Sequence, residues 1–349
     1  MRHHLGYPLV PKLIAGFLAV ACLGGVSACG RAPSSAEEPL VVTTFVEFPD
    51  EFLRLEVMVD SLRTFGGRLK NAPVWAYVAE ELLGSPSGSL DTAKRLGAEV
   101  RSIYAPENVT WFPLVRKVFA AAHAEAQASG RASVLARLDP DTIFIDEPAE
   151  YLLPEGKSLG WRPVFHRNIG SLFDEPLDAY WSRAYEVMGI RDEAVFPMIT
   201  PADGHRIRPY FQAGCVVVRP ERGLLKKWEE TLVRLAADPL IRDLCGKDQS
   251  KRTFTFQAAL TGAVLNHLER GEMTALSDRI NYPLFFREMF GGGKDFHDMT
   301  SVATVRYEYF FQNAPPDWDK TIRGPADRIA WIKDRFGSEG QDPDHLGRR

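Results

Sequence analysis

Cysteine is scarce in this 349-residue chain, which has four cysteines and no Cys-x-x-Cys pair or cysteine–histidine cluster. A disulfide-stapled scaffold and a structural zinc site of the usual spacing are therefore excluded. A surplus of basic residues is also missing, because 42 lysines and arginines face 46 acidic residues and the formal net charge is −4. This balance argues against a protein that binds nucleic acid through a broad basic surface, and no nucleic-acid partner is expected.

Long hydrophobic runs are limited to one uncharged stretch ahead of Cys29, which excludes a membrane protein with several spans. Arg2 and Lys12 precede this stretch and no acidic residue does, as in a secretory signal. The stretch ends in Val-Ser-Ala before Cys29, an arrangement that resembles the lipobox of bacterial lipoproteins. We therefore expect a signal peptide over 1–28, lipid attachment at Cys29 and a linker over 29–39.

This leader predicts that the folded domain lies outside the cytosol, on a lipoprotein of the cell membrane or outer membrane that faces the periplasm or the cell surface. The alternative is an uncleaved signal anchor of the Golgi type. Beyond the leader only Cys215 and Cys245 remain. In an oxidising compartment these two form either a disulfide or two separate buried thiols, and both alternatives stay open.

The body of the chain has the composition of a globular domain, with 45% hydrophobic and 25% charged residues. Strands are predicted over 40–45, 72–78, 98–104 and 134–138. Helices are predicted over 51–65, 91–96 and 112–128. This alternation is typical of an α/β fold with a mostly parallel sheet and helices on both faces. The second half is less regular, with helices predicted over 177–188, 224–237, 254–268 and 326–336 and a strand over 214–218.

Asp139 and Asp141 are the most informative pair, because they follow the apolar segment 134–138 directly. Ligands of open α/β sheets bind at the carboxyl ends of the strands. Two carboxylates separated by one residue can share a divalent cation, which in turn neutralises a diphosphate. The alternative is a solvated turn, since Asp-Pro is common in turns.

Four sequence blocks in a fixed order resemble those of the GT-A class of nucleotide-diphospho-sugar glycosyltransferases. The first is VVTTF with the helical segment that ends in SLRTFGG, and the second joins WFPLVRKVFAAAHAEAQ to VLARLDPDTIFIDEP. The third is RPYFQAGCVVVR over 208–219, and the fourth begins with KDQS over 247–250. The resemblance spans 41–284 and is to bacterial and archaeal members of the class, so it implies fold and ligand class better than reaction.

The resemblance implies a GT-A-like domain over 40–337. Its nucleotide-binding half would cover 40–146 and its acceptor-side half 147–337. The polar segment 338–349 is expected to be a flexible tail.

Carried over position by position, the resemblance implies that Asp139 and Asp141 hold Mn²⁺ or Mg²⁺ and, through it, the donor diphosphate. Lys117 would contact a phosphate, or else be a solvated helix lysine. Asp248 is the candidate catalytic carboxylate and would bind a hydroxyl of the acceptor or of the transferred sugar, or else cap a helix. The other implied donor-binding residues are Thr43, Thr44 and Phe45 at the nucleotide, and Gln212, Ala213 and Gly214 beside the sugar.

The chain departs from the pattern of the class at two places. Gln212 replaces the usual asparagine of the Asn-Ala-Gly block, and no His-x-x-Gly-x-x-Lys-Pro motif supplies a third metal ligand. His166 and His297 are the nearest candidates, although a lone histidine is more often structural. The Gly-Gly-Gly-Lys segment 291–294 lacks the spacing of a P-loop. Aromatic residues suited either to sugar stacking or to core packing are Trp161, Tyr180, Trp181 and Tyr185.

These observations favour a metal-dependent glycosyltransferase that moves a sugar from a nucleotide- or lipid-linked diphosphate donor to a glycan or lipid acceptor. Nucleotide sugars are cytosolic in bacteria, whereas export and membrane attachment through Cys29 are predicted here. A non-catalytic exported lipoprotein that binds a glycan or a phosphorylated ligand is therefore the second hypothesis. A metal-dependent phosphodiesterase or pyrophosphatase ranks third, because one aspartate pair supplies too few ligands.

Overall fold

The computed structural model describes residues 37–336, except 85, 288–296, 309, 312–313 and 315–316. The predicted leader with Cys29, the glycine-rich segment 291–294 and the tail over 338–349 lie outside the described residues. Within the described part of the chain, every helix is too short or too polar to span a bilayer.

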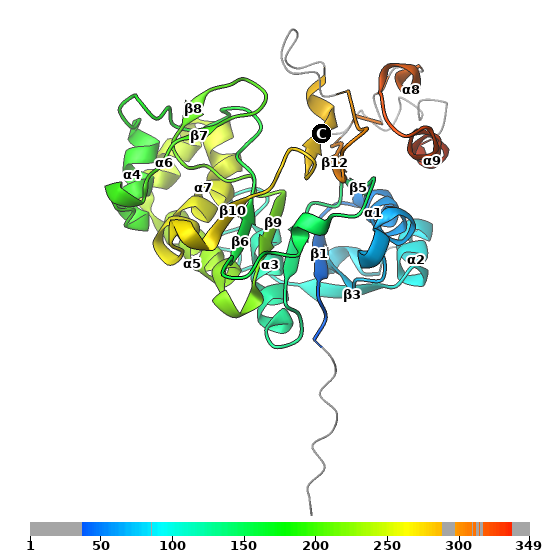
Figure 1. The fold of residues 1–349 in the computed structure, drawn as a ribbon. Coiled ribbons are helices and arrows are strands. Elements are labelled where there is room, and N and C mark those ends of the chain that lie inside the picture. Colours follow the sequence, from blue (N-terminus) through cyan, green and yellow to red (C-terminus); the bar gives the residue numbers. More distant parts are fainter. Residues whose placement is uncertain are drawn as a thin grey trace, which may run out of the picture. The chain divides into compact units, whose positions relative to one another are not determined.

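A seven-stranded sheet forms the centre of the fold, in the order β10-β6-β9-β4-β1-β2-β3 (Figure 1). Its strands are β1 (Val41–Val46), β2 (Val74–Ala79), β3 (Ala98–Ile103), β4 (Leu135–Leu138), β6 (Leu159–Trp161), β9 (Cys215–Val218) and β10 (Met273–Ala275). Neighbouring strands are parallel except at β9, which runs antiparallel to both β4 and β6. The sheet is therefore mostly parallel, as predicted.

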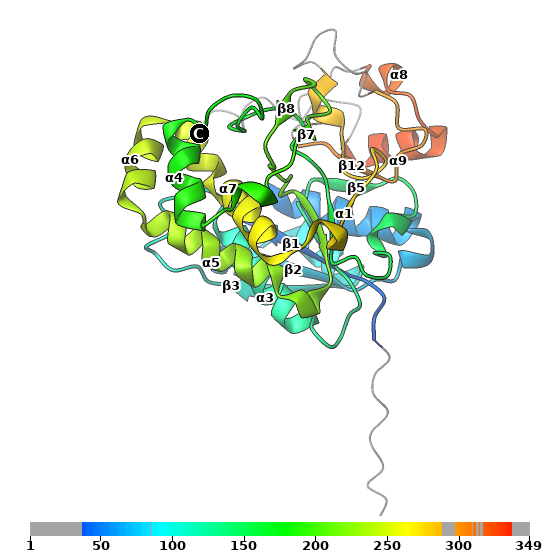
Figure 2. The ribbon, with the colours of Figure 1, turned by 60° about the vertical axis from the view of Figure 1, so that its left-hand side comes forward.

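Helices lie on both faces of this sheet (Figures 1 and 2). On one face α1 packs against α2, and on the other α3, α5 and α7 pack in a row. The helices are α1 (Glu51–Phe65), α2 (Gly88–Arg95), α3 (Arg116–Ala128), α4 (Ala179–Met188), α5 (Leu224–Ala237), α6 (Pro239–Lys247), α7 (Gln249–His267), α8 (Trp318–Thr321) and α9 (Ala326–Phe336). Because both faces are covered, all six residues of β1 are buried, which explains its continuous apolar and β-branched sequence.

A second, three-stranded sheet lies beyond the carboxyl end of β4, in the order β11-β12-β5. Its strands are β5 (Thr142–Phe144), β11 (Tyr282–Pro283) and β12 (Thr304–Arg306), and β12 runs antiparallel to β5. Aromatic residues of the C-terminal part, among them Phe311 and Trp318, form an apolar cluster with α9 beside this sheet. Since β5 begins one residue after Asp141, its pairing with β12 brings the end of β12 to the aspartate turn. A separate two-stranded ribbon pairs β7 (Met198–Ile199) with β8 (Arg206–Ile207).

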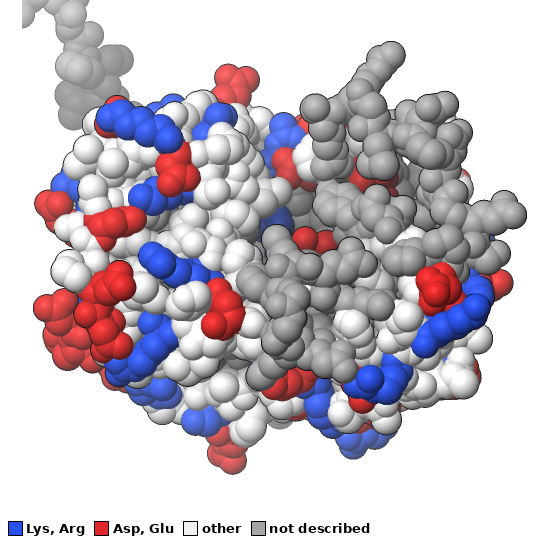
Figure 3. Space-filling model, turned by 90° about the horizontal axis from the view of Figure 1, so that it is seen from above, with Lys and Arg blue, Asp and Glu red and all other residues white. Residues whose placement is uncertain are grey.

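The starts of α2 and α4 differ from the sequence prediction by three and two residues, and those of α3 and α7 by four and five, the last two for local reasons. α3 begins at Arg116 rather than at residue 112, because Pro113 and the positive φ of Leu114 (62°) interrupt a helical backbone there. α7 begins at Gln249 rather than at residue 254, because the Asp248 side chain accepts a hydrogen bond from the Lys251 amide and caps the helix. Viewed from above, acidic and basic side chains are interspersed on the visible described surface (Figure 3).

Candidate functional site

The turn that holds Asp139 and Asp141 is a buried, hydrogen-bonded corner at the carboxyl end of β4. The Asp139 amide donates to the Gly214 carbonyl at 2.9 Å, and the Tyr307 amide donates to the Asp141 carbonyl at 3.1 Å. The Thr142 hydroxyl donates to the Asp139 carbonyl at 2.8 Å. The two aspartates are only 5% and 4% exposed. The solvated-turn interpretation is therefore wrong for this pair.

Three cationic side chains converge on the Asp139 carboxylate. Arg137 Nη2 lies 2.6 Å and Lys117 Nζ 3.1 Å from Oδ1, while Arg306 Nη1 lies 2.9 Å from Oδ2. Burial alone would raise the pKa of Asp139, but the three cations outweigh burial and lower it well below its usual range. Asp139 is therefore a carboxylate at neutral pH, held in a cage of positive charge. Lys117 is a member of this cage and not a solvated helix lysine, since only 13% of its side chain is exposed.

Sequence analysis missed three charged residues of this site, namely Arg137, Glu308 and Arg306, which lies at the end of β12. The Arg306 guanidinium contacts Asp139, lies 3.6 Å from Asp141 Oδ2 through Nε, and lies 3.2 Å from Glu308 Oε1 through Nη2. Burial would lower the pKa of Arg306, but the three carboxylates raise it, so the guanidinium stays charged. For Glu308 burial dominates and raises the pKa, while Arg306 opposes the shift.

The start of β9 supplies the backbone that faces this cage. The Gln212 side chain turns back, and its Oε1 accepts a hydrogen bond from the Gly214 amide at 2.9 Å. Ala213 is fixed from both sides, because its amide donates to Gln257 Oε1 at 3.0 Å and its carbonyl accepts from Arg137. A Cβ at Gly214 would overlap the Arg306 guanidinium and lie 2.9 Å from Asp139 Oδ2. Glycine is thus required for Arg306 to reach the aspartates.

A cleft of about 260 Å³ opens beside this cage, and Gln212 and Gly214 line it whereas Ala213 does not. Contact of these three residues with a sugar stays a prediction. Lys117 and Arg306 of the cage line this cleft together with the carboxylates of Asp139 and Glu308. Aromatic side chains form much of the remaining wall, namely Phe165, Phe254, Phe256 and Phe286. Among the described residues, four non-glycine residues have positive φ, and three of them line this cleft: Leu114, Asn168 and Glu308. Such strained backbone is held in place by the surrounding structure and is concentrated at functional sites.

A divalent cation does not fit the aspartate pair in this arrangement. Of the four carboxylate oxygens, both of Asp139 and one of Asp141 face cationic side chains. Across the described chain, no three His, Cys, Asp or Glu side chains come together as a metal site would need. Of the two candidate third ligands, His166 lines the cleft and its Nδ1 accepts from the Asn168 amide at 3.2 Å, whereas His297 is not among the lining residues. Binding of Mn²⁺ or Mg²⁺ stays a prediction, and it would require Arg306 to move.

The residues predicted at the nucleotide lie inside the sheet. Thr43, Thr44 and Phe45 are at most 4% exposed, and the Thr43 hydroxyl donates to the Trp75 carbonyl at 3.1 Å. The pocket of about 350 Å³ at the end of β1 is lined instead by the residues that follow, beginning with Glu47. Contact of Thr43, Thr44 and Phe45 with a nucleotide stays a prediction, which this burial does not favour.

Asp248 lies in a neighbouring pocket of about 440 Å³ and not in the cleft of Asp139. Its Oδ1 accepts from the Lys251 amide at 3.1 Å, so the capping alternative is correct, while 41% of its side chain remains exposed. Asn168 lines both this pocket and the cleft, so the two spaces adjoin. A catalytic role for Asp248 stays a prediction.

The remaining candidates of the sequence analysis are structural. Tyr180, Trp181 and Tyr185 are buried in the core around α4, and the Trp161 ring packs edge-on against Phe211 with centroids 5.4 Å apart. Only Trp181 also contributes to the wall of the Asp248 pocket. Cys215 and Cys245 are separate buried thiols, so the disulfide alternative is wrong.

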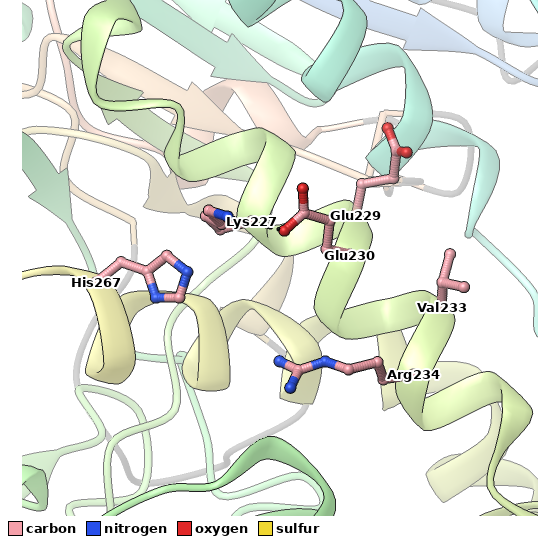
Figure 4. Close-up of a pocket in the computed structure, with 6 residues that line it drawn as sticks. All are labelled: Lys227, Glu229, Glu230, Val233, Arg234 and His267. Atoms are coloured by element: carbon pink, nitrogen blue, oxygen red, sulfur yellow. Dashed lines mark hydrogen bonds and ion pairs between the residues drawn. The ribbon is translucent and has the colours of Figure 1, made fainter.

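A further hollow lies on α5 and the end of α7, lined by Lys227, Glu229, Glu230, Val233, Arg234 and His267 (Figure 4). Lys227 and Glu230 form an exposed ion pair there at 3.0 Å. None of these residues lines the Asp139 cleft, and the hollow offers no buried charged group. Lys227, an exposed lysine away from the cleft, is therefore a suitable control for substitution of Lys117.

The structure is an α/β protein with a charged cleft where the parallel strands end, which is the edge at which open α/β sheets bind ligands. A model of the family described as the Rhodobacterales glycosyltransferase domain matches residues 55–267, more than half of the chain. The chain belongs to this glycosyltransferase family. The predicted α/β, GT-A-like fold class is confirmed by this membership together with the sheet topology.

Solved structures similar to this chain are also glycosyltransferases. A galactosyltransferase, LgtC, crystallised in complex with donor and acceptor sugar analogues, is 15% identical, with a TM-score of 0.41, over 87% of this chain and 98% of its own. Mouse xyloside xylosyltransferase 1 in its apo form is 13% identical, with a TM-score of 0.40, over 77% of this chain and 97% of its own. No curated protein matches the sequence. Likeness at this level assigns neither residues nor substrates to this chain.

Proposed function

We propose that the chain is a glycosyltransferase whose donor is a sugar linked to a diphosphate, and that the donor binds in the Asp139 cleft. The observation that carries the proposal is the convergence of Lys117, Arg137 and Arg306 at the carboxyl end of the parallel strands. Such an array of fixed positive charge suits a ligand that arrives with negative charge and whose leaving group gains more of it. The family membership supports the sugar as the group transferred.

The transfer breaks the bond between the sugar C1 and the diphosphate oxygen and forms a bond between C1 and an acceptor hydroxyl oxygen. The hydroxyl proton leaves to a carboxylate or to solvent, and the bonding electron pair leaves with the diphosphate. Lys117 and Arg306 line the cleft and would stabilise that departing charge. The aromatic walls would exclude water and so favour transfer over hydrolysis.

The pockets on either side of the cleft suit the two ends of the reaction. The pocket at the end of β1 is lined by Arg116, the chain neighbour of the cleft residue Lys117, and would receive the part of the donor beyond the diphosphate. Its Glu47 would accept hydrogen bonds from the ribose hydroxyls of a nucleotide-linked donor. The Asp248 pocket is polar, adjoins the cleft at Asn168, and would receive the acceptor.

The donor is linked either to a nucleotide or to a membrane lipid, and both present the same diphosphate chemistry to the cation cage. The predicted lipid anchor at Cys29 would place the cleft near a membrane and outside the cytosol, which favours the lipid-linked donor. The same predicted export supports the alternative of a binding lipoprotein without activity.

A thermal-shift screen of the full chain with nucleotide sugars and prenyl-diphosphate sugars tests the proposal. Ligand at about 100 times its Kd adds roughly 2.7 kcal/mol of stability, which shifts Tm by several degrees. Lys117→Gln should abolish the shift, and Lys227→Gln, which removes an exposed lysine, should keep it. A stabilising donor without turnover would favour the binding lipoprotein. No shift with any donor would overturn the proposed function.

A further inference from the structure

The Arg306 guanidinium lies where a shared cation would have to be. It contacts Asp139 Oδ2 at 2.9 Å and is 3.6 Å from Asp141 Oδ2, so one planar group faces both carboxylates. Only 14% of its side chain is exposed. The absent side chain of Gly214 leaves the space that it fills. Position, burial and backbone therefore all fix this group between the two aspartates.

Charge is already balanced around the pair. Three carboxylates, from Asp139, Asp141 and Glu308, meet three cationic side chains. A divalent cation added here would need either the expulsion of Arg306 or a surplus of positive charge in a buried site, which is costly. A diphosphate can instead keep the balance by displacing a carboxylate from the cations, and Glu308 is the most exposed of the three carboxylates.

Two buried polar atoms of the cluster have unsatisfied hydrogen-bonding capacity. Arg306 Nε is a buried donor without a hydrogen-bond partner among the described residues, and Asp141 Oδ1 is a buried acceptor in the same state. Buried polar groups are rarely left unsatisfied, so each such atom needs an explanation, and a bound ligand is one that suits a residue lining a cleft, as Arg306 does. A guanidinium offers five N–H donors in a planar fork that matches phosphate oxygens. Arg306 lines the cleft whereas Asp141 does not, so the contact that this geometry supports is a phosphate oxygen at the guanidinium.

We infer that Arg306 replaces the divalent cation, and that the site binds the donor diphosphate without metal. This inference deepens the proposed function and rests on it for the identity of the ligand. Glu308, whose side chain is 37% exposed, is the carboxylate that the incoming phosphate would displace from the guanidinium. Asp139 and Asp141 then act as positioning residues that hold Arg306 rather than as metal ligands.

The first test uses Mn²⁺ alone. The free-Mn²⁺ electron paramagnetic resonance signal is titrated with the full wild-type chain and with Asp141→Asn. If Arg306 takes the place of the metal, both proteins leave the signal equally unchanged. Stoichiometric loss of the signal with the wild type, abolished by Asp141→Asn, would overturn the inference. This readout requires neither a donor nor turnover.

The second test measures binding of UDP, GDP, CDP and ADP by calorimetry, in EDTA and then in Mn²⁺. The expected result is binding in EDTA that Mn²⁺ does not tighten, and that Arg306→Ala weakens about tenfold or more. Arg306→Lys keeps the charge without the planar fork, so its affinity should lie between those of Arg306→Ala and the wild type. It also keeps a cation beside the aspartates, so it can be measured if the alanine variant folds poorly. Arg191→Gln, which removes a 69%-exposed arginine, is the control for loss of one positive charge.

The outcomes of the two tests separate the inference from the proposed function. Binding of a diphosphate only in Mn²⁺, or unchanged affinity of Arg306→Ala in EDTA, would overturn the role of Arg306. Absence of binding under every condition, together with a negative screen of lipid-linked donors, would overturn the proposed function. In that case the Mn²⁺ titration still decides whether the aspartate pair is a metal site.

Discussion

Substitution of one backbone position, Gly214→Ala, should weaken donor binding without removing any charged group. An alanine Cβ would overlap Arg306 Nη1 and lie 3.0 Å from Arg306 Cζ, so the guanidinium must leave its place between the aspartates. Overpacking of this kind costs about 1–3 kcal/mol of stability. Loss of a charge-assisted contact to phosphate is worth about 1.5–3 kcal/mol, or roughly ten- to a hundredfold in Kd.

The matched control is Gly160→Ala in β6 of the same sheet. A Cβ there would meet Leu153 Cδ2 at 2.9 Å and Leu276 Cδ2 at 3.0 Å, so it strains an apolar contact away from the cleft. Its Tm should fall, while its Kd for the diphosphate should match the wild type. Titration calorimetry at a temperature where all three proteins are folded measures Kd, and scanning calorimetry measures Tm. Wild-type affinity in Gly214→Ala, or an equal loss in both variants, would refute the reasoning.

Three further predictions concern groups outside the cation cage. Burial raises the pKa of Glu125 from 4.5 to about 7, so its contribution to stability is present below pH 4.5 and is lost as the pH rises through about 7. Relative to Glu125→Gln, the free energy of unfolding of the wild type should therefore fall by about 3 kcal/mol over that range. Denaturant titrations in which the two proteins have parallel pH profiles would contradict this. Asp248→Asn keeps a helix cap whereas Asp248→Ala does not, so only the alanine variant should lose stability, by about 1 kcal/mol, and have a lower Tm. If Asp248 binds the acceptor, transfer should be reduced in both variants. Full activity of Asp248→Asn would show that the charge is not needed. Cys215 and Cys245 are unpaired thiols, so reducing agent should leave Tm unchanged, and a Tm that drops in reducing agent would indicate a disulfide. Burial raises the pKa of Cys215 to about 12, so this thiol should resist alkylation in the native protein at pH 8.

Much of the fold follows from local sequence patterns. β1 and β4 are short strands made mostly of apolar and β-branched residues, and the periodicity of 51–65 predicts α1 to its last residue. Asp139 and Gly214 were found for a related reason, since both follow or precede a recognisable strand. The rule that ligands bind at the carboxyl ends of parallel strands then placed them in one site.

Arg306 could not be found in the same way. It ends a three-residue strand in a stretch without clear periodicity, and only the pairing of β12 with β5 brings it to the aspartates. The segment 40–45 was correctly predicted as a strand, but a β-branched strand does not show where the sheet ends and the pocket begins, so the sequence could not place Thr43 and Thr44 relative to the pocket. Contacts between segments that are distant in the chain depend on topology, which the local pattern does not contain.

A crystal structure of the full chain, grown in EDTA with the diphosphate donor or nucleoside diphosphate that stabilises it most, would show whether Lys117 and Arg306 bind the diphosphate without metal. We predict phosphate oxygens within hydrogen-bond distance of Lys117 Nζ and of the Arg306 guanidinium, with Arg306 still in contact with Asp139. A ligand bound away from the Asp139 cleft, or a diphosphate that leaves Lys117 and Arg306 without contact, would contradict the account.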